Sequence, residues 1–252
     1  MGPPRYVPLL LVLAVACGPG GDVVAPASPS PTVDRAEQLA DVTAAVADVA
    51  AAQAAADPLL ASALTGVREV DVLVARLRDP ATVDTAKDQW PRVASAVDGV
   101  DLAPLRPAIR RIAFTVDRAR AALAIAERTA PTDWEARYLA AEDETLLAVR
   151  TYAQEADALA QVLERYWPTY EAIAALTGPF VERRWVYRSS EEAAAAYEVE
   201  ISRHLAELAR AQASIEEFRE RRDEAGRAVN EAVAETREVF RDRPTAEPSV
   251  TP

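Results

Sequence analysis

Apolar residues recur every seven positions between residues 189 and 241, and this recurrence constrains the fold more than any other feature of the chain. One set of positions holds Ile201, Leu208, Ile215, Arg222, Val229 and Thr236. A second set, three residues further on each time, holds His204, Ala211, Phe218, Ala225, Ala232 and Val239. A seven-residue repeat is typical of a helix that packs along its whole side against another helix. The segment would be about 75 Å long at 1.5 Å per residue.

The segment before it carries a matching apolar stripe, from about residue 132 to residue 176. Its members are Leu146, Val149, Ala153, Ala156, Ala160, Leu163 and Trp167. Thr132 with Glu135, and Ser189 with Glu192, have the spacing of a capping box and would begin the two helices. Pro168 predicts a kink and Gly178-Pro179 an end. With a linker of about a dozen residues the two helices would be antiparallel. We therefore predict a long, coiled-coil-like helical hairpin over residues 131–243.

The rest of the chain also favours helices. Glycine occurs between residues 33 and 243 only at Gly66, Gly99, Gly178 and Gly226, alanine is abundant, and Val and Ile follow helical spacing. Asp57-Pro58 and Asp79-Pro80 read as helix starts. They predict helices over about 33–56, 57–77 and 80–97, and a fourth helix begins after Asp101. The predicted fold class is all-α: an elongated helical bundle, with residues 33–130 as its N-terminal helices.

Residues 1–16 have the pattern of a signal peptide, with one basic residue, Arg5, followed by an apolar run from Val7 to Ala16. Ten apolar residues are too few to span a bilayer of about 30 Å. The run ends in LAVAC, and Cys17 is the only cysteine of the chain. This segment resembles the lipobox of bacterial lipoproteins, although Ala14 stands where that class most often has Leu. The resemblance implies cleavage before Cys17 and lipidation of its thiol, with fatty acyl chains such as palmitate. A plain secretory signal with an incidental cysteine is the alternative.

The flanking segments and the charge agree with an anchored, exported protein. Residues 17–32 would be the lipidated cysteine with a Pro-, Gly- and Ser-rich tether, and residues 244–252 a disordered tail. The formal net charge is −12, and removal of residues 1–16 would take away one positive charge. A surface this acidic is repelled by nucleic acid, so we expect no nucleic-acid binding. The expected location is the extracytoplasmic face of the cell membrane, or its periplasmic side in a cell with two membranes.

Aromatic residues gather around the predicted turn of the hairpin. They are Tyr166, Trp167, Tyr170, Phe180, Trp185, Tyr187 and Tyr197, and arginines lie among them. Such a mixture is typical of protein interfaces, but large rings also close the end of a helical bundle. We expect Trp185 to pack inward and Tyr187, with Arg183 or Arg184, to be an exposed contact. The candidate partner-binding set is Arg183, Arg184, Trp185, Tyr187 and Arg188.

Catalytic and metal sites have little support in the sequence. The chain has one histidine, His204, and no glycine-rich phosphate loop. His204 and Glu207 form the HxxE pair found in imelysin-like exported iron-binding proteins, which it resembles in this pair alone. Ser202 stands where that family usually has glycine, and one such pair arises often by chance in a Glu-rich chain. We predict no catalytic residues, no metal site and no cofactor.

These observations favour a structural or adaptor lipoprotein and not an enzyme. Its expected partners are the membrane, through the lipid on Cys17, and an envelope protein or cell-wall polymer. The alternative is a helical-bundle lipoprotein that binds a small ligand or a metal, and a hydrolase with an unrecognised site is least favoured.

Overall fold

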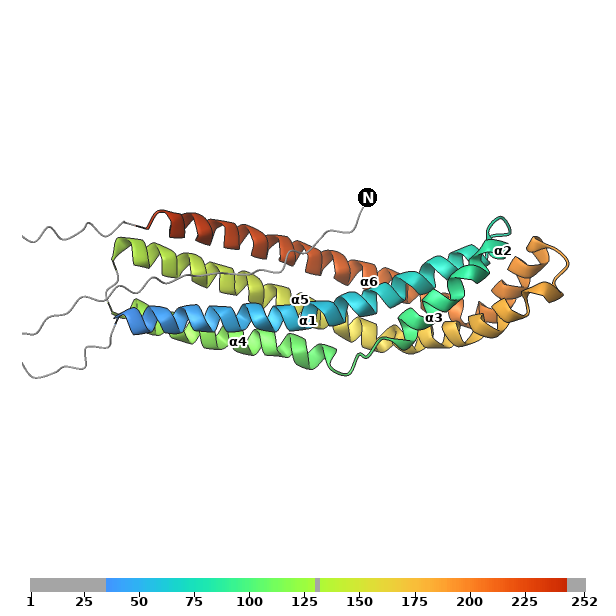
Figure 1. Cartoon of the computed structure of the whole chain (residues 1–252), viewed down its shortest axis with the longest axis horizontal. Helices are drawn as coiled ribbons and strands as arrows, with labels where there is room; N and C mark the ends of the chain where they lie inside the picture. Colours follow the sequence, from blue (N-terminus) through green and yellow to red (C-terminus); the bar gives the residue numbers. More distant parts are fainter. Residues whose placement is uncertain (1–34, 130–131, 244–252) are drawn as a thin grey trace, which may run out of the picture. The chain divides into compact units, whose positions relative to one another are not determined.

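The computed structural model describes residues 35–129 and 132–243, and these residues form helices joined by short turns, with no strand among them. The elements are α1 (Arg35–Leu77), α2 (Val83–Ala86), the 3-10 turn η1 (Lys87–Gln89), α3 (Trp90–Asp98), α4 (Leu105–Glu127), α5 (Asp133–Glu182), the 3-10 turn η2 (Arg184–Val186) and α6 (Ser190–Arg241) (Figure 1). The predicted all-α helical bundle is confirmed. The predicted signal peptide (1–16), Cys17 with its tether (17–32) and the tail (244–252) lie outside the described residues.

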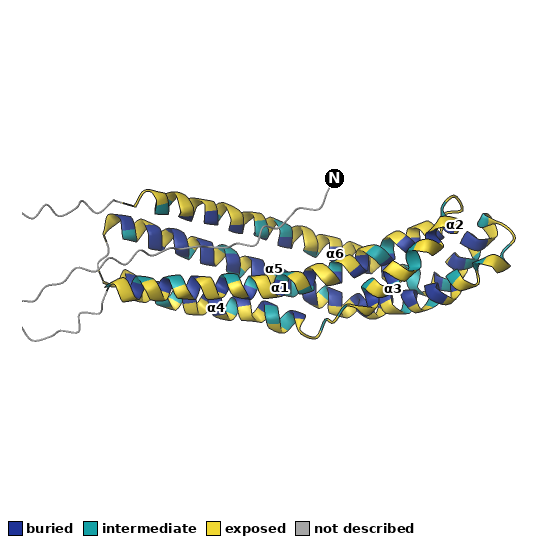
Figure 2. Ribbon diagram, viewed as in Figure 1, coloured by how far each residue is buried: buried dark blue, intermediate teal, exposed yellow. Residues whose placement is uncertain are grey.

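The chain forms two compact units that are not consecutive stretches of sequence. Among the described residues, unit 1 comprises 35–54, 111–129, 132–153 and 224–243, and unit 2 comprises Ala55–Arg110 and Gln154–Asp223. Helices α1, α4, α5 and α6 each contribute residues to both units. Figure 2 shows that buried residues form a stripe along each of these helices, as expected of amphipathic helices that pack against one another within each unit.

In unit 1, polar contacts between the helices flank the apolar core. Arg118 of α4 pairs with Asp48 of α1 at 3.5 Å, and Arg120 pairs with Asp143 of α5 at 2.7 Å. Thr236 of α6 donates a hydrogen bond to the Ala141 carbonyl of α5 at 3.0 Å. The core side chains themselves are Val42, Val46, Val49, Ile112, Val116, Leu123, Leu139, Leu146, Val149, Val229 and Val233.

The predicted antiparallel pairing of α5 and α6 is present in each unit. In unit 1 the Trp134 indole donates to the Val239 carbonyl at 2.9 Å, and in unit 2 the Thr177 and Tyr197 hydroxyls are 2.8 Å apart. The α5 stripe and the first α6 set face the core, whereas in the second α6 set, from His204 to Val239, only Ala211 and Ala225 are buried. All six positions from Ile201 to Thr236 at seven-residue spacing are buried, and so are all seven positions from Leu146 to Trp167. The two capping-box helix starts are also confirmed. Glu135 N–H donates to the Thr132 hydroxyl at 3.3 Å, and Glu192 N–H donates to the Ser189 hydroxyl at 3.2 Å.

The helix boundary predicted at Asp57-Pro58 is wrong, because α1 continues through Pro58. A proline inside a helix lacks the N–H that would bond the carbonyl four residues before it, here that of Ala54. Ala54 is also the residue at which α1 passes from unit 1 to unit 2. Side chains on both sides of the proline, such as Val49 and Leu60, are buried. Their packing keeps the helix continuous despite the missing hydrogen bond.

The helix end predicted at Gly178-Pro179 is also wrong, because α5 continues to Glu182. Gly178 meets a packing requirement there. A Cβ atom on Gly178 would lie 2.8 Å from the ring of Trp90 in α3. Gly66 of α1 has the same role toward Trp167 of α5, also at 2.8 Å. Both glycines let a helix backbone lie directly against a tryptophan ring in unit 2.

Candidate functional site

The predicted partner-binding residues lie on the tight connection between α5 and α6 in unit 2. The N–H of Arg183 donates to the carbonyls of Pro179 and Phe180, which closes the last turn of α5. The 3-10 turn η2 follows, and Tyr187 then has extended backbone with φ −84° and ψ 138°. The Glu192 carboxylate accepts a hydrogen bond from the Arg188 N–H at 2.9 Å as α6 begins. We call residues 183–188 the hairpin tip.

Arg184 fixes the hairpin tip to α2. Its guanidinium lies 2.6 Å from one carboxylate oxygen of Asp84, and the Ser190 hydroxyl donates to the other oxygen at 2.6 Å. The hydrogen bond from Ser190 and the charge of Arg184 hold the pKa of Asp84 below its usual value. The Arg184 side chain is only 13% exposed. It is therefore a structural contact, and its predicted role as an exposed contact is not supported by its position.

Tyr187 is held inward on the other side of the turn. Its ring stacks on Phe180 with centroids 5.6 Å apart, and Phe180 contacts Tyr197 at 4.8 Å. Phe180 and Tyr197 are fully buried, and Tyr187 is half-buried. Tyr166, Trp167 and Tyr170 of the same aromatic group are buried as well. Most of these rings therefore serve the core of unit 2.

Trp185 is the exception, and its predicted inward packing is wrong. Its side chain is 83% exposed, and the neighbouring Val186 is 57% exposed. Because Arg184 and Tyr187 on either side are directed inward, the short turn leaves Trp185 and Val186 on its outer side. The predicted roles of Trp185 and Tyr187 are reversed: the tryptophan is the exposed ring and the tyrosine is the packed one.

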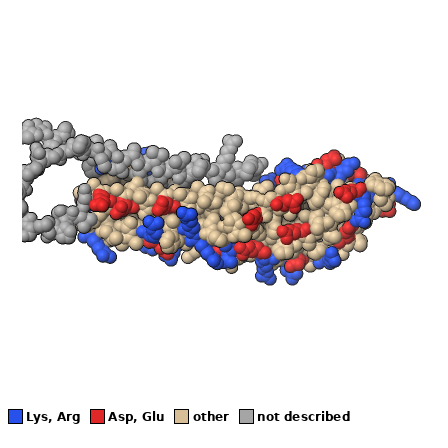
Figure 3. All heavy atoms as spheres, turned by 60° about the horizontal axis from the view of Figure 1, so that its bottom comes forward, with Lys and Arg blue, Asp and Glu red and all other residues tan. Residues whose placement is uncertain are grey.

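Two arginines border the exposed pair. Arg183 forms an ion pair with Glu200 at 3.1 Å, while Arg188 is exposed and forms no ion pair within residues 35–129 and 132–243. Elsewhere the surface charge is mixed, and Figure 3 shows Lys and Arg side chains interspersed with Asp and Glu on the visible face. The hairpin tip thus combines a rigid backbone, two exposed apolar side chains and adjacent positive charge.

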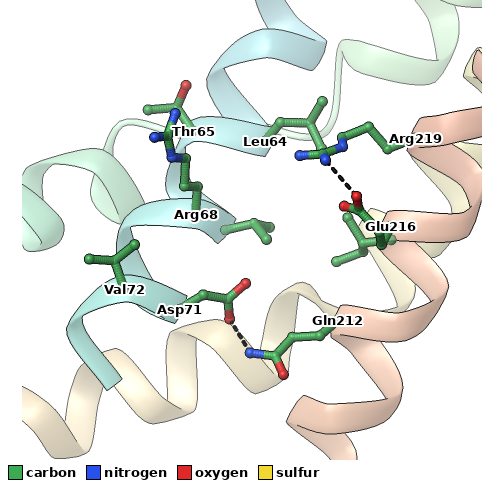
Figure 4. Close-up of a pocket in the computed structure, with 10 residues that line it drawn as sticks. Leu64, Thr65, Arg68, Asp71, Val72, Gln212, Glu216 and Arg219 are labelled. Carbon is green, nitrogen blue, oxygen red and sulfur yellow. Dashed lines mark hydrogen bonds and ion pairs between the residues drawn. The ribbon is translucent and has the colours of Figure 1, made fainter. Parts of the chain in front are cut away.

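A second site, a pocket between α1 and α6 in unit 2, was not predicted from the sequence (Figure 4). Asp71 of α1 accepts a hydrogen bond from the Gln212 amide of α6 at 2.8 Å. Burial raises the pKa of Asp71 to about 6, although the Gln212 hydrogen bond acts in the opposite direction. Neither residue belongs to a recognisable motif, and they are 141 positions apart. A carboxyl group with a raised pKa in a concave surface can mark a functional site. The raised pKa of Asp71 depends on the fold, so it could not be predicted from the sequence.

His204 has a local partner. Its Nε2 accepts a hydrogen bond from the Arg203 guanidinium at 3.1 Å. Within the described part of the chain, no three His, Cys, Asp or Glu residues come together in a way that could hold a metal ion.

Comparison of the chain with protein-family models, curated proteins and solved structures found no match. Of the helices described, α1 alone is long and apolar enough to cross a membrane by length and composition. Packed core helices and signal sequences pass the same test, and α1 buries Val42, Val46 and Leu60 within the units.

Proposed function

We propose that the chain is a lipoprotein, tethered to the extracytoplasmic face of the cell membrane through Cys17, that acts as an adaptor and binds an envelope protein through its hairpin tip. The observation that carries the proposal is the 83% exposure of Trp185 on a turn whose neighbours are fixed. Tryptophan is the residue type most enriched among the hot spots of protein interfaces. An exposed tryptophan side chain lowers the solubility of a protein. The contacts of Arg184 and Tyr187 nevertheless hold Trp185 in an exposed position.

Rigidity of the hairpin tip supports a binding role. The pairing of Arg184 with Asp84 and the stacking of Tyr187 on Phe180 hold the turn from both sides. A preorganised loop loses less conformational entropy on binding than a flexible one. The partner surface that fits is an apolar pocket for Trp185 and Val186 with a carboxylate placed for Arg188.

Site-specific photo-crosslinking in the native envelope tests this proposal. A photoreactive phenylalanine analogue at position 185 should give one defined protein adduct. The matched control places the analogue at Phe114 of α4, another exposed aromatic residue at 63% exposure, but in unit 1. Equal adducts from both positions would refute the hairpin tip as the contact. An adduct that a cell-wall hydrolase digests would identify a wall polymer instead of a protein.

Binding of the purified partner then gives the energetic test. Trp185→Ala should weaken the affinity by about tenfold, which corresponds to about 1.4 kcal/mol. Phe114→Ala should leave the affinity unchanged. Unchanged binding by Trp185→Ala would contradict the proposal.

A further inference from the structure

The pocket between α1 and α6 has the size of a small-molecule site. Its volume is about 460 Å³, within the range of about 300–1,000 Å³ found for ligand pockets. One wall comes from α1 and the other from α6, and all lining residues belong to unit 2. Leu64, Val67 and Ile215 supply apolar surface on both walls. None of the residues that line the pocket belongs to the hairpin tip. A proposal for the pocket is therefore independent of the adaptor proposal.

Asp71 is the carboxylate of this pocket that no cation neutralises. One of its oxygens accepts the hydrogen bond from Gln212, and Figure 4 shows the other directed toward the space between the two helices. Asp71 forms no ion pair within the part of the chain that the structure describes. The pocket therefore offers an acceptor oxygen in a partly desolvated position, which favours a hydrogen-bond donor that carries positive charge.

The other charged groups of the pocket are engaged or directed elsewhere. Glu216 and Arg219 of α6 neutralise each other in an ion pair at 2.6 Å. Arg68, one turn before Asp71 on α1, extends toward Thr65 and away from the carboxylate in Figure 4. The wall facing Asp71 thus carries no net charge.

A buried tyrosine lies close to Asp71. Tyr170 of α5 is 0% exposed, and its hydroxyl has no hydrogen bond of good geometry among the described residues. The hydroxyl nevertheless lies close enough to Asp71 for the two to influence each other's pKa, and burial with this carboxylate raises the pKa of Tyr170. Tyr170 is fully buried and does not line the pocket, so Asp71 is the group of this pair that is open to a ligand.

We propose that this pocket binds the ammonium group of a small alkylamine, with Asp71 as the anionic partner and the alkyl chain against Val67 and Ile215. A primary ammonium has three N–H donors, which matches a site with acceptors on one side and apolar surface around them.

Titration of the chain with n-butylammonium, followed by calorimetry or by NMR of the Gln212 amide, tests the proposal. We expect saturable binding that becomes tighter from pH 5 to pH 7, as Asp71 loses its proton. Butyrate, which has the same alkyl length and the opposite charge, should not bind. Absence of saturable binding, or equal binding of butyrate, would overturn the proposal.

Two variants assign the binding to Asp71. Asp71→Asn keeps the shape of the side chain and should weaken n-butylammonium binding at pH 7 by at least tenfold and remove its pH dependence. Glu217→Gln removes an exposed carboxylate of α6 that does not line the pocket, and it should change the affinity by less than twofold. Equal losses in both variants would indicate non-specific attraction to an acidic surface and refute the role of Asp71. The pH dependence of the unmodified chain tests the proposal even if Asp71→Asn does not fold.

Discussion

The exposure of Trp185 is set by its immediate neighbours. Arg184 is held by Asp84 and Tyr187 by Phe180, so the side chains between them point outward. The Arg184 restraint cannot be read from spacing, because Asp84 is 100 positions away in the sequence. The composition of residues 165–197 predicted a mixture of core and contact residues, and the structure decides which ring has which role.

We therefore expect Trp185→Ala and Tyr187→Ala to differ in stability. Trp185→Ala should change the free energy of unfolding by less than about 0.5 kcal/mol, as is usual for exposed side chains. Tyr187→Ala should lower it by about 1–2 kcal/mol, because it loses a stacked and half-buried ring. Denaturant titration measures both values. An equal loss in the two variants would mean that Trp185 packs against the protein.

Glu142 of α5 is the most unusual buried group in unit 1. Its side chain is 1% exposed, and neither carboxylate oxygen has a hydrogen-bond partner of good geometry among the described residues. Burial raises the pKa of Glu142, and the nearby Tyr138 hydroxyl opposes that effect only in part. The carboxyl group is thus stabilised in its neutral form in the folded chain.

The sign of the resulting pH dependence follows from the raised pKa. The neutral Glu142 contributes its full stability below the ordinary value of 4.5, and this contribution is lost as the pH rises toward the folded-state pKa. As the pH rises from 4.5 to 8, the free energy of unfolding of Glu142→Gln should therefore fall less than that of the unmodified chain. Asp71 acts in the same direction between 3.8 and about 6. Urea denaturation at several pH values measures the slope, and identical slopes with and without Glu142 would contradict its neutral form.

At the scale of the helix, glycine and proline act through the helices that pack beside them. Pro58 and Pro179 lie inside helices, and Gly178 allows α5 to approach Trp90. Local rules predict a boundary at each of these residues, because an isolated helix would lose stability there. Packing of the apolar stripes on both sides outweighs that loss.

The glycines give a matched pair of substitutions. Gly178→Ala gains about 1 kcal/mol of helix propensity but places its methyl group 2.8 Å from the Trp90 ring. Overpacking of this kind costs about 1–3 kcal/mol, so we expect a net loss of stability. Gly226→Ala meets only Tyr152 at 3.9 Å, an ordinary contact, and should be stabilising by about 0.5–1 kcal/mol. Thermal unfolding compares the two, and stabilisation by Gly178→Ala would show that the Trp90 ring moves freely.

At the scale of the whole molecule, the membrane anchor is a prediction from the sequence that the described residues do not address. Changing Cys17→Ser should abolish labelling of the protein by a fatty-acid analogue, because no other cysteine thiol exists in the chain. The precursor should then remain uncleaved or appear as a soluble product. The control is Cys17 intact with Trp185→Ala, which should be labelled normally. Equal labelling of Cys17→Ser and the unmodified chain would refute the lipoprotein proposal.

The sequence alone determined the helical class, the start of α5 and α6, and the buried face of each. These properties are periodic and local: every position from Ile201 to Thr236 at seven-residue spacing is buried, even where it is Arg222 or Thr236. The tertiary structure decided three other matters. It carried α1 through Pro58, turned Trp185 outward, and brought Asp71 to Gln212. Each of these depends on side chains far away in the sequence, whose packing free energy exceeds the local preference of a proline, an aromatic ring or a single carboxylate.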